Sequence, residues 1–418
     1  MTETKSVITC DLEGRIETFS EGAEVLFGWK ADDIVGKKRV SFFSPGLVVL
    51  EHVETWLKSA VKDGEFSTRT VFLQKSGGLF PAEIKITPTK KDGVHIGYCG
   101  VTRALPDVSL ADASPKISPA TRIFSALVIT RAPFLTVTLI PILAAFFYLA
   151  HMGLHSTGAL LTVALIGGVA LHVAANTFND YFDWKSGADL DNNEYFLPFS
   201  GGSRAIELGL ITPRGLLGIA IGSIVTACAC GAYLVSHAGL GVLIFGVVGA
   251  LIAYFYTAPP IYFAGHGLGE LMVALCFGPL MTAGTAFALT GQAPLAAYLV
   301  GIPVGLLTAA ILWINEFPDA PSDERMGKRT LVVMLGIKNA RWGYFALVLG
   351  AFGMVVAGIA AGLFPVKTAL VFLTAPLAFQ AVKIVMQNYQ DRTLVRASKS
   401  TVMLHLVFGI LFIAGCYF

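Results

Sequence analysis

The chain has 418 residues, of which 55% are hydrophobic and only 14% are charged, and its formal net charge is +2. A soluble globular protein carries about 25% charged residues, so much of this chain is expected to face lipid. No basic patch interleaved with aromatic residues occurs in the sequence, which argues against a nucleic-acid partner. The charged residues concentrate in segments: residues 1–107 have the composition of a soluble domain, whereas the chain beyond about 120 is strongly apolar.

Residues 6–103 predict a small α+β domain. Short apolar runs bounded by turn residues predict five strands, at 7–10, 15–19, 65–74, 79–88 and 94–103. Between the second and third strands we expect a short helix over 21–27, ended by Gly28, and an amphipathic helix over 47–62. This order of strands and helices is typical of an α+β fold.

Two stretches of this domain, DLEGRIETFSEGAEVLFGWKADDIVGK (11–37) and GGLFPAEIKITPTKKDGVHIGYCGVTR (77–103), resemble the PAS sensor family. The resemblance implies a five-stranded sheet with helices on one face, used for ligand sensing or dimerisation. As an assembly module, the domain would instead recruit a pathway partner. No ligand carries over, because no cysteine stands in the Asn-Cys-Arg context of the light-sensing flavin variants. His52 is either a haem ligand or, the favoured reading, a partly exposed helix histidine. An empty core used only for protein contacts is the remaining alternative.

Residues 104–120 contain three Pro and several Ser, Ala and Asp, which predicts a linker. We therefore expect a PAS-like sensor domain at 1–107, a linker at 108–121 and a membrane domain at 122–418. An all-α membrane bundle of nine transmembrane helices is predicted from apolar segments long enough to span a bilayer, at about 125–150, 157–179, 213–236, 238–257, 267–290, 293–316, 340–363, 365–387 and 400–418.

Lysine and arginine residues are distributed unequally between the two ends of these segments. One side carries many of them, whereas the opposite side has essentially only Lys367. Since cytoplasmic loops carry an excess of Lys and Arg, the N-terminal domain and the loops on the basic side are expected in the cytoplasm. The protein is accordingly predicted to be a multi-pass protein of the inner or plasma membrane.

Two acidic clusters lie at the ends of apolar segments on this basic side. Asn176, Asp180 and Asp183 are spaced i, i+4, i+7, which places all three on one face of a continuing helix. Asp319 and Asp323 follow a second apolar run. Carboxylates at membrane depth are costly unless they bind something, and Mg²⁺ prefers carboxylates together with substrate phosphate oxygens. The clusters therefore indicate a site for metal ions that carry a diphosphate.

Four basic residues flank the clusters and are candidates to bind that diphosphate: Lys185, Arg204, Lys328 and Arg329. Arg131, at the start of the first membrane helix, is a fifth candidate. The alternative interpretation of each residue is that it only sets the orientation of the protein in the membrane, or that its side chain extends its charge to the membrane surface. That alternative is weaker for the acidic residues, because four carboxylates gather at two helix ends.

The membrane part resembles the UbiA superfamily of intramembrane prenyltransferases over residues 122–418. The stretches that carry the resemblance are NDYFDWKSGAD (179–189), PFSGGSRAIELGLI (198–211), YTAPPI (256–261), GLGEL (267–271) and DERMGKRTLVVMLG (323–336). That superfamily has nine helices and two Asp-rich motifs, after the second and sixth helices. Asn176, Asp180 and Asp183 match the first motif, and Asp319 and Asp323 match the second.

The resemblance implies that the Asp residues and Asn176 hold Mg²⁺ on a polyprenyl diphosphate. Departure of the diphosphate leaves an allylic cation, which an electron-rich aromatic acceptor attacks. Aromatic side chains near the motifs are candidates to stabilise the cation or, alternatively, simple packing residues: Phe178, Tyr181, Phe182, Tyr254 and Tyr256. Tyr256 and the basic residues are the implied substrate-binding set, and the apolar bundle, open to membrane lipid, is the implied site of the prenyl tail.

Within the superfamily the quoted stretches are most similar to the 1,4-dihydroxy-2-naphthoate polyprenyltransferases of menaquinone synthesis. The Tyr-x-x-x-Lys motif of many 4-hydroxybenzoate relatives is absent, since Pro260 follows Tyr256 at that spacing. Pro318 stands where naphthoate relatives more often have Arg, and Pro318 and Pro321 are expected to kink or break the helix. Acceptors such as 4-hydroxybenzoate, homogentisate, a glycerol-ether lipid or chlorophyllide stay open. A membrane transporter or a PAS-linked receptor is the alternative from another class of protein. That alternative predicts broken helices with acidic residues in the middle of the membrane, whereas the acidic residues here lie at the ends of apolar segments.

Overall fold

The structure is a computed structural model that describes residues 5–186, 202–391 and 393–417. The described residues form two compact units. The first contains the N-terminal domain and helix α6 (Pro119–Ile129), together with residues 180–186 and 204–216. The second contains the other described residues from 131 onward and is almost entirely helical. Residues 187–189 and 198–201, which belong to stretches quoted above, lie outside the described residues.

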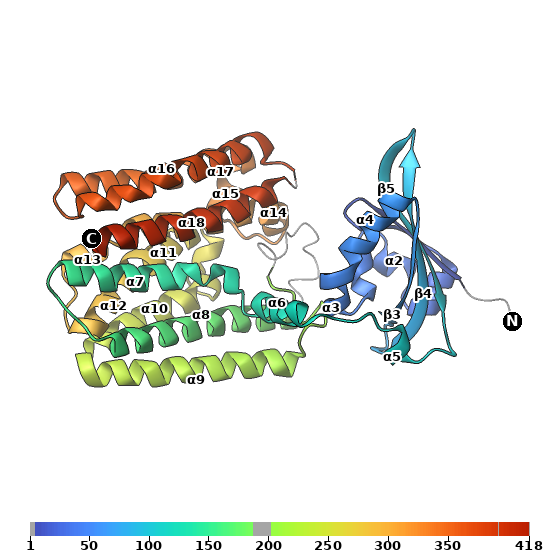
Figure 1. The fold of residues 1–418 in the computed structure, drawn as a ribbon, viewed down its shortest axis with the longest axis horizontal. Coiled ribbons are helices and arrows are strands. Elements are labelled where there is room, and N and C mark those ends of the chain that lie inside the picture. The colour runs from blue at the N-terminus through green and yellow to red at the C-terminus, as the bar shows by residue number, and fades with distance from the viewer. Residues whose placement is uncertain (1–4, 187–201, 392, 418) are drawn as a thin grey trace. The chain divides into compact units, whose positions relative to one another are not determined.

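The N-terminal domain contains a five-stranded antiparallel sheet in the order β2-β1-β5-β4-β3. Figure 1 labels β3, β4 and β5 of this sheet. The strands are β1 (Lys5–Asp11), β2 (Ile16–Phe19), β3 (Phe66–Leu73), β4 (Leu79–Lys91) and β5 (Val94–Ala104). All five predicted strands are confirmed close to their expected ends. The hairpin between β4 and β5 turns at Asp92 and Gly93, whose φ angles of 51° and 79° are those of a type I′ turn.

Helical segments follow β2, as predicted, and their bounds are α1 (Glu21–Phe27), α2 (Ala31–Ile34), η1 (Val40–Phe43), α3 (Gly46–Val48), η2 (Val49–Val53) and α4 (Glu54–Asp63). Gly28 ends α1 with a φ of 76°, a conformation that glycine adopts without steric cost. The helix expected over 47–62 is continuous but contains the π-helical turn η2. The core between helices and sheet is filled by aromatic rings, Phe19, Phe27, Phe43, Phe72 and Phe80.

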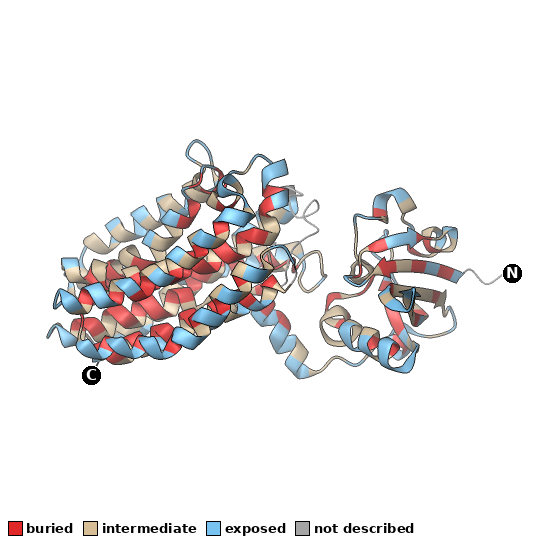
Figure 2. Cartoon of the chain, turned by 90° about the horizontal axis from the view of Figure 1, so that it is seen from above, coloured by how far each residue is buried: buried red, intermediate tan, exposed pale blue. Residues whose placement is uncertain are grey.

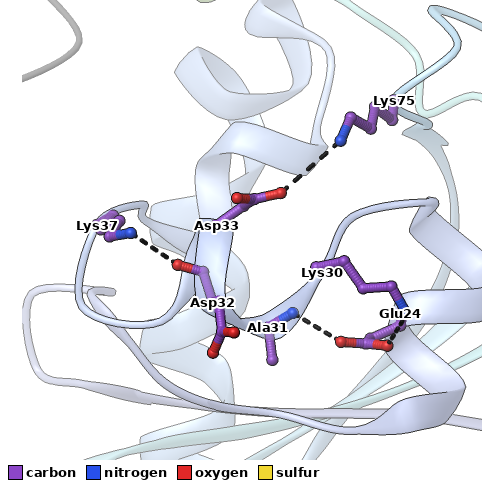
Figure 3. Close-up of polar contacts among 7 residues, drawn as sticks. All are labelled: Glu24, Lys30, Ala31, Asp32, Asp33, Lys37 and Lys75. Carbon is purple, nitrogen blue, oxygen red and sulfur yellow. Dashed lines mark hydrogen bonds and ion pairs between the residues drawn. The ribbon is translucent and has the colours of Figure 1, made fainter.

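The connection from α1 to α2 is held by side chains that bridge the two helices (Figure 3). The Glu24 carboxylate accepts a hydrogen bond from the backbone N–H of Ala31 at 2.8 Å and pairs with the Lys30 ammonium at 2.8 Å. Lys37 donates to the backbone carbonyl of Asp32 at 2.8 Å. The two Glu24 contacts cross the turn that begins at Gly28, whereas the Lys37 contact lies beyond it. All three lie at the surface, where each contributes little stability.

The predicted linker has more structure than its composition suggests. It contains the short helix α5 (Leu110–Ala113), and Ile117 packs against the apolar cluster of Val48, Trp56 and neighbouring residues. Ser118 caps α6 by accepting from the N–H of Thr121, and its own N–H donates to the Glu51 carboxylate at 2.9 Å. The linker is therefore attached to the N-terminal domain through the π-helical turn η2.

The membrane part is a bundle of long apolar helices that run side by side (Figure 1). The bounds of its helices are η3 (Ala132–Phe134), α7 (Thr136–His151), α8 (Gly158–Ser186), α9 (Pro213–Ala238), α10 (Gly241–Thr257), η5 (Phe263–Gly265), α11 (Gly269–Leu275), η6 (Cys276–Leu280), α12 (Met281–Thr290), α13 (Leu295–Leu299), α14 (Ile302–Arg325), α15 (Leu331–Leu335), α16 (Ile337–Ala360), η7 (Val366–Thr374), α17 (Ala375–Asn388) and α18 (Leu394–Tyr417).

Eight stretches of the described chain are long and apolar enough to cross a membrane. They correspond to eight of the nine predicted segments. The segment expected over 238–257 forms α10, which at 17 residues is shorter than these spans. Buried residues concentrate inside the bundle, as Figure 2 shows, and its largest core cluster joins α14, α16 and α18 around Tyr344, Phe408 and Phe412.

The second acidic cluster lies inside a helix and not after its end. Helix α14 continues to Arg325 with Pro318 and Pro321 both in its interior, so of the two expected outcomes, a kink or a break, the break does not occur. Each proline removes one backbone donor. The helix persists because neighbouring turns are fixed by packing: Ile314, Phe317 and Ala320 belong to the main core cluster.

Candidate active site

The first motif lies on the last turns of α8. Because α8 is helical through Ser186, Asn176, Asp180 and Asp183 share one face, as their spacing predicted. Asp180 is only 5% exposed. Asn176 donates its amide N–H to the carbonyl of His172 at 2.9 Å, so the amide oxygen is the atom that can serve as a ligand. Lys185 comes two residues after Asp183 and is exposed.

The second motif lies on the final turns of α14. Asp323 is 5% exposed, and one of its oxygens pairs with the ammonium of Lys328 at 3.0 Å. The backbone N–H of Lys328 also donates to the carbonyl of Asp323 at 2.8 Å, across the turn that ends the helix. Burial alone would lower the pKa of Lys328, but the carboxylates of Asp323, Glu316 and Asp319 outweigh that effect and raise the pKa above its ordinary value. Lys328 is therefore a cation fixed beside the motif.

Two further carboxylates belong to this cluster, and the sequence interpretation did not assign them to the site. Glu316, on α14, and Glu270, at the start of α11, are 6% and 3% exposed. The phenol of Tyr256 interacts electrostatically with both and with Asp323. A signal for Glu316 was present: its i, i+3, i+7 spacing with Asp319 and Asp323 matches the helical periodicity of the first motif.

The remaining basic candidates differ in their surroundings. Arg204 is buried and pairs with Glu207 at 2.9 Å, and its φ of 49° is a left-handed conformation that costs about 1–3 kcal/mol in a non-glycine residue. Arg131 has a similar φ of 50°. Arg329 is exposed, and its backbone N–H donates to the carbonyl of Gly265 at 3.2 Å. That contact joins the loop after α14 to the loop before α11.

Within the second unit the structure thus brings together Tyr256, Glu270, Glu316, Asp319, Asp323 and Lys328. Carboxylate and amide oxygens are the ligands that Mg²⁺ prefers, and Asp323 is a buried carboxylate of this kind. The residue types of each motif are therefore those that bind magnesium. In the part of the chain that the structure describes, no three His, Cys, Asp or Glu side chains already converge as a metal centre.

Comparison with known proteins identifies relatives of both the membrane part and the N-terminal domain. Residues 138–407 match the UbiA prenyltransferase family, and residues 4–103 match the PAS domain. The chain is 29% identical over 292 residues to the 1,4-dihydroxy-2-naphthoate octaprenyltransferase of Bacillus subtilis (strain 168), covering 69% of this chain and 90% of that protein. It is 30% identical over 261 residues to the enzyme of the same name from Escherichia coli (strain K12), covering 61% of this chain and 83% of that protein.

A solved structure shares the fold of the membrane part. The apo structure of a UbiA homolog from Aeropyrum pernix K1 matches with a TM-score of 0.52 and 20% sequence identity, covering 66% of this chain and 96% of that chain. Together with the family match over more than half of the chain, this fold and the long apolar helices settle the class of protein. The chain is a multi-pass membrane prenyltransferase that belongs to the UbiA prenyltransferase family and carries an N-terminal PAS domain.

Proposed function

We propose that the protein transfers a polyprenyl group from a polyprenyl diphosphate to an aromatic quinone precursor, with 1,4-dihydroxy-2-naphthoate as the acceptor, in menaquinone synthesis. The names of the Bacillus and Escherichia relatives support this acceptor. The observation that carries the reaction class is the buried carboxylate of Asp323 with its fixed partner Lys328, at the end of a membrane helix.

The five motif residues, Asn176, Asp180, Asp183, Asp319 and Asp323, would hold Mg²⁺. When bound, Mg²⁺ neutralises the negative charge that develops on a departing diphosphate. Lys328 supplies a charge-assisted hydrogen bond to the same diphosphate, and Arg329, Arg204, Lys185 and Arg131 are further candidates for this role. Apolar helices around the motifs exclude the water that would otherwise quench the allylic cation.

The membrane topology is part of the proposal. We count α10 as a ninth span, because at about 1.5 Å per residue its 17 residues cover most of a bilayer core of about 30 Å. The excess of Lys and Arg on the side of the two motifs supports a cytoplasmic PAS domain and cytoplasmic active-site loops.

The division of labour follows the proposed boundaries at 1–107, 108–121 and 122–418. We assign regulation of the enzyme or recruitment of a partner to the PAS domain. Phenylalanine rings fill the described part of its core, and its described residues contain no acidic motif like those of the membrane part. A truncated protein that begins at Ser114 should therefore retain prenyl transfer. Complete loss of transfer in a correctly folded truncated protein would place part of the chemistry in the PAS domain.

One observation favours a second candidate acceptor. Pro318 precedes Asp319, where naphthoate enzymes more often have Arg, so 4-hydroxybenzoate or another acceptor of the superfamily is the runner-up. The deciding experiment supplies a radiolabelled prenyl diphosphate and Mg²⁺ with each acceptor separately and identifies the products by mass spectrometry. Prenylation of 1,4-dihydroxy-2-naphthoate at a rate at least tenfold above that of the others supports the proposal, and preference for another acceptor refutes it.

A further inference from the structure

A buried histidine in the middle of α8 has a ring nitrogen that no described residue satisfies. His172 stands midway between Gly158 and Ser186, the two ends of the helix, and is 7% exposed. Its Nε2 atom is fully buried and has no hydrogen-bond partner among the described residues. Ionisable side chains inside a membrane helix are costly, and buried polar atoms almost always have a partner. The unsatisfied nitrogen therefore points to a bound ligand as its partner.

The other ring nitrogen decides whether Nε2 is a donor or an acceptor. Nδ1 lies 3.0 Å from Oγ1 of Thr138, a residue of α7 that is 1% exposed. Within the described part of the chain this is the one side-chain hydrogen bond of Thr138, so its hydroxyl proton has an acceptor only if the hydroxyl donates to Nδ1. A neutral imidazole carries one proton, which then lies on Nε2. The unsatisfied atom is thus an N–H donor, the kind of buried group that is rarely left unpaired.

Close packing between α7 and α8 holds the imidazole ring in place. Gly168 lies one turn before His172 on α8, just as Thr138 and Ile142 lie one turn apart on α7. A Cβ on Gly168 would lie 2.7 Å from Cδ1 of Ile142 and 3.1 Å from Cγ2 of Thr138, so the missing side chain lets the two helices approach. The ring also meets Phe277 of η6 edge-on, with the two centroids 6.5 Å apart. Contacts with α7 and with η6 therefore both hold the ring.

His172 lies on the motif face of α8 but deeper in the bundle. It precedes Asn176 by four residues, which places both on one face and separates them by about 6 Å at about 1.5 Å per residue. The π-helical turn η6 also packs against α14, the helix of the second motif, because a Cβ on Gly278 would lie 2.9 Å from the Cα of Gly305. Such turns often occur at functional sites. The Nε2–H donor is therefore on the membrane side of the metal motif, beside an element that contacts α14.

The chemistry of the substrates decides which of them can accept from this donor. In the proposed reaction the diphosphate belongs at the acidic motifs, and a prenyl chain has no hydrogen-bond acceptor. Water could accept, but water beside the reacting carbon would quench the allylic cation. An aromatic acceptor carries hydroxyl or carboxylate oxygens, which accept from an N–H group.

We propose that Nε2–H of His172 donates a hydrogen bond to an oxygen substituent of the aromatic acceptor and so sets the orientation of its ring towards the prenyl carbon, an assignment that rests on the proposed prenyl transfer. A site built to hydrogen-bond a substrate group rejects analogues that lack the group, because the buried donor is then left unpaired. His172 is accordingly a specificity-determining residue for the acceptor.

A second buried histidine provides an internal control. His405 of α18 is 1% exposed, and its Nε2 lies 3.1 Å from Oγ1 of Thr308. The Thr308 hydroxyl already donates to the carbonyl of Val304 at 3.0 Å, so it accepts from Nε2–H of His405. The atom of His405 without a partner among the described residues is Nδ1, which is then an acceptor. An unmet acceptor is tolerated better than an unmet N–H donor, so we assign His405 a packing role.

The experiment measures the KM of each substrate separately in full-length His172→Leu and His405→Leu. The KM for 1,4-dihydroxy-2-naphthoate should rise about fivefold or more in His172→Leu, while the KM for the prenyl diphosphate changes less than about twofold. His172→Gln keeps an N–H donor and should recover most of this loss. His405→Leu should leave both KM values within about twofold of wild type, whatever its effect on the Tm. A rise confined to the prenyl diphosphate, or an equal acceptor effect in the two leucine variants, would overturn the proposal.

A second measurement uses the wild-type enzyme and does not depend on turnover. NMR of isotope-labelled histidine nitrogens reports which ring nitrogen carries the proton, and the signals of His172 are those missing from His172→Gln. Nε2 of His172 should be protonated, and its signal should shift when 1,4-dihydroxy-2-naphthoate is added without prenyl diphosphate. An unprotonated Nε2, or a signal that the acceptor leaves unchanged, contradicts the proposal. If the wild-type enzyme prenylates only 4-hydroxybenzoate, the proposed acceptor is wrong, and the same titration with that phenol decides the role of His172.

Discussion

The contact between α14 and α11 gives a quantitative test of how the site is assembled. In Gly305→Ala the new Cβ would lie 3.0 Å from the Cα of Gly278, and closer still to the carbonyl oxygen of Ala274. Backbone atoms cannot rotate away, so the helices must separate. Overpacking of this kind costs about 1–3 kcal/mol, and the better helix propensity of alanine offsets up to about 1 kcal/mol. The expected net loss is about 1–2 kcal/mol.

The assay follows thermal unfolding in detergent together with acceptor KM. A loss of this size lowers the Tm by about 2–8 °C, and separation of the helices should also raise the KM for the aromatic acceptor, because α14 carries the second motif and α11 carries Glu270. Gly353→Ala, on α16, is the matched control, since a Cβ there meets no atom within 4 Å. An unchanged Tm and KM in Gly305→Ala, or equal losses in both variants, would refute this account of the packing.

Two further predictions concern charged contacts outside the membrane spans. Lys328→Met should raise the KM for the prenyl diphosphate about tenfold or more and leave the acceptor KM unchanged. Because the pKa of Lys328 is raised, its stabilising contribution is present below the ordinary lysine pKa of about 10.4 and is lost only as the pH rises through the higher folded-state pKa. Glu51→Gln should speed proteolysis of the linker at 105–117, whereas the exposed control Glu54→Gln should not. The hydrogen bond from Ser118 lowers the pKa of Glu51, so its contribution is present above the ordinary value of about 4.3 and is lost as the pH falls through the lower folded-state pKa.

Local patterns were enough to predict much of this structure. The Asp92-Gly93 turn, the αL cap at Gly28 and the common face of Asn176, Asp180 and Asp183 depend on a few neighbouring residues. Helix α14 shows where such reasoning ends, because core packing keeps it continuous through Pro318 and Pro321.

Tertiary contacts account for what the sequence did not predict. Glu270 and Glu316 interact although they lie on different helices, α11 and α14, and a glycine such as Gly305 in an apolar helix does not specify which neighbouring helix it will contact. The attachment of Ser118 to Glu51 likewise depends on how the linker packs against the PAS domain. Neither contact leaves a periodic signal in a single sequence, whereas the spacing of Glu316 with Asp319 and Asp323 does.

The most direct test of the central claim is single-turnover transfer from a radiolabelled prenyl diphosphate at saturating Mg²⁺. The four variants are Asp180→Asn, Asp183→Asn, Asp319→Asn and Asp323→Asn, and Asp391→Asn, after α17, is the control. Each motif variant should lose transfer by about 10²- to 10³-fold, as expected for removal of electrostatic stabilisation from a developing charge, and should still purify as a folded membrane protein. Near-normal transfer in any two of the four variants would contradict the assignment of the acidic motifs to the active site.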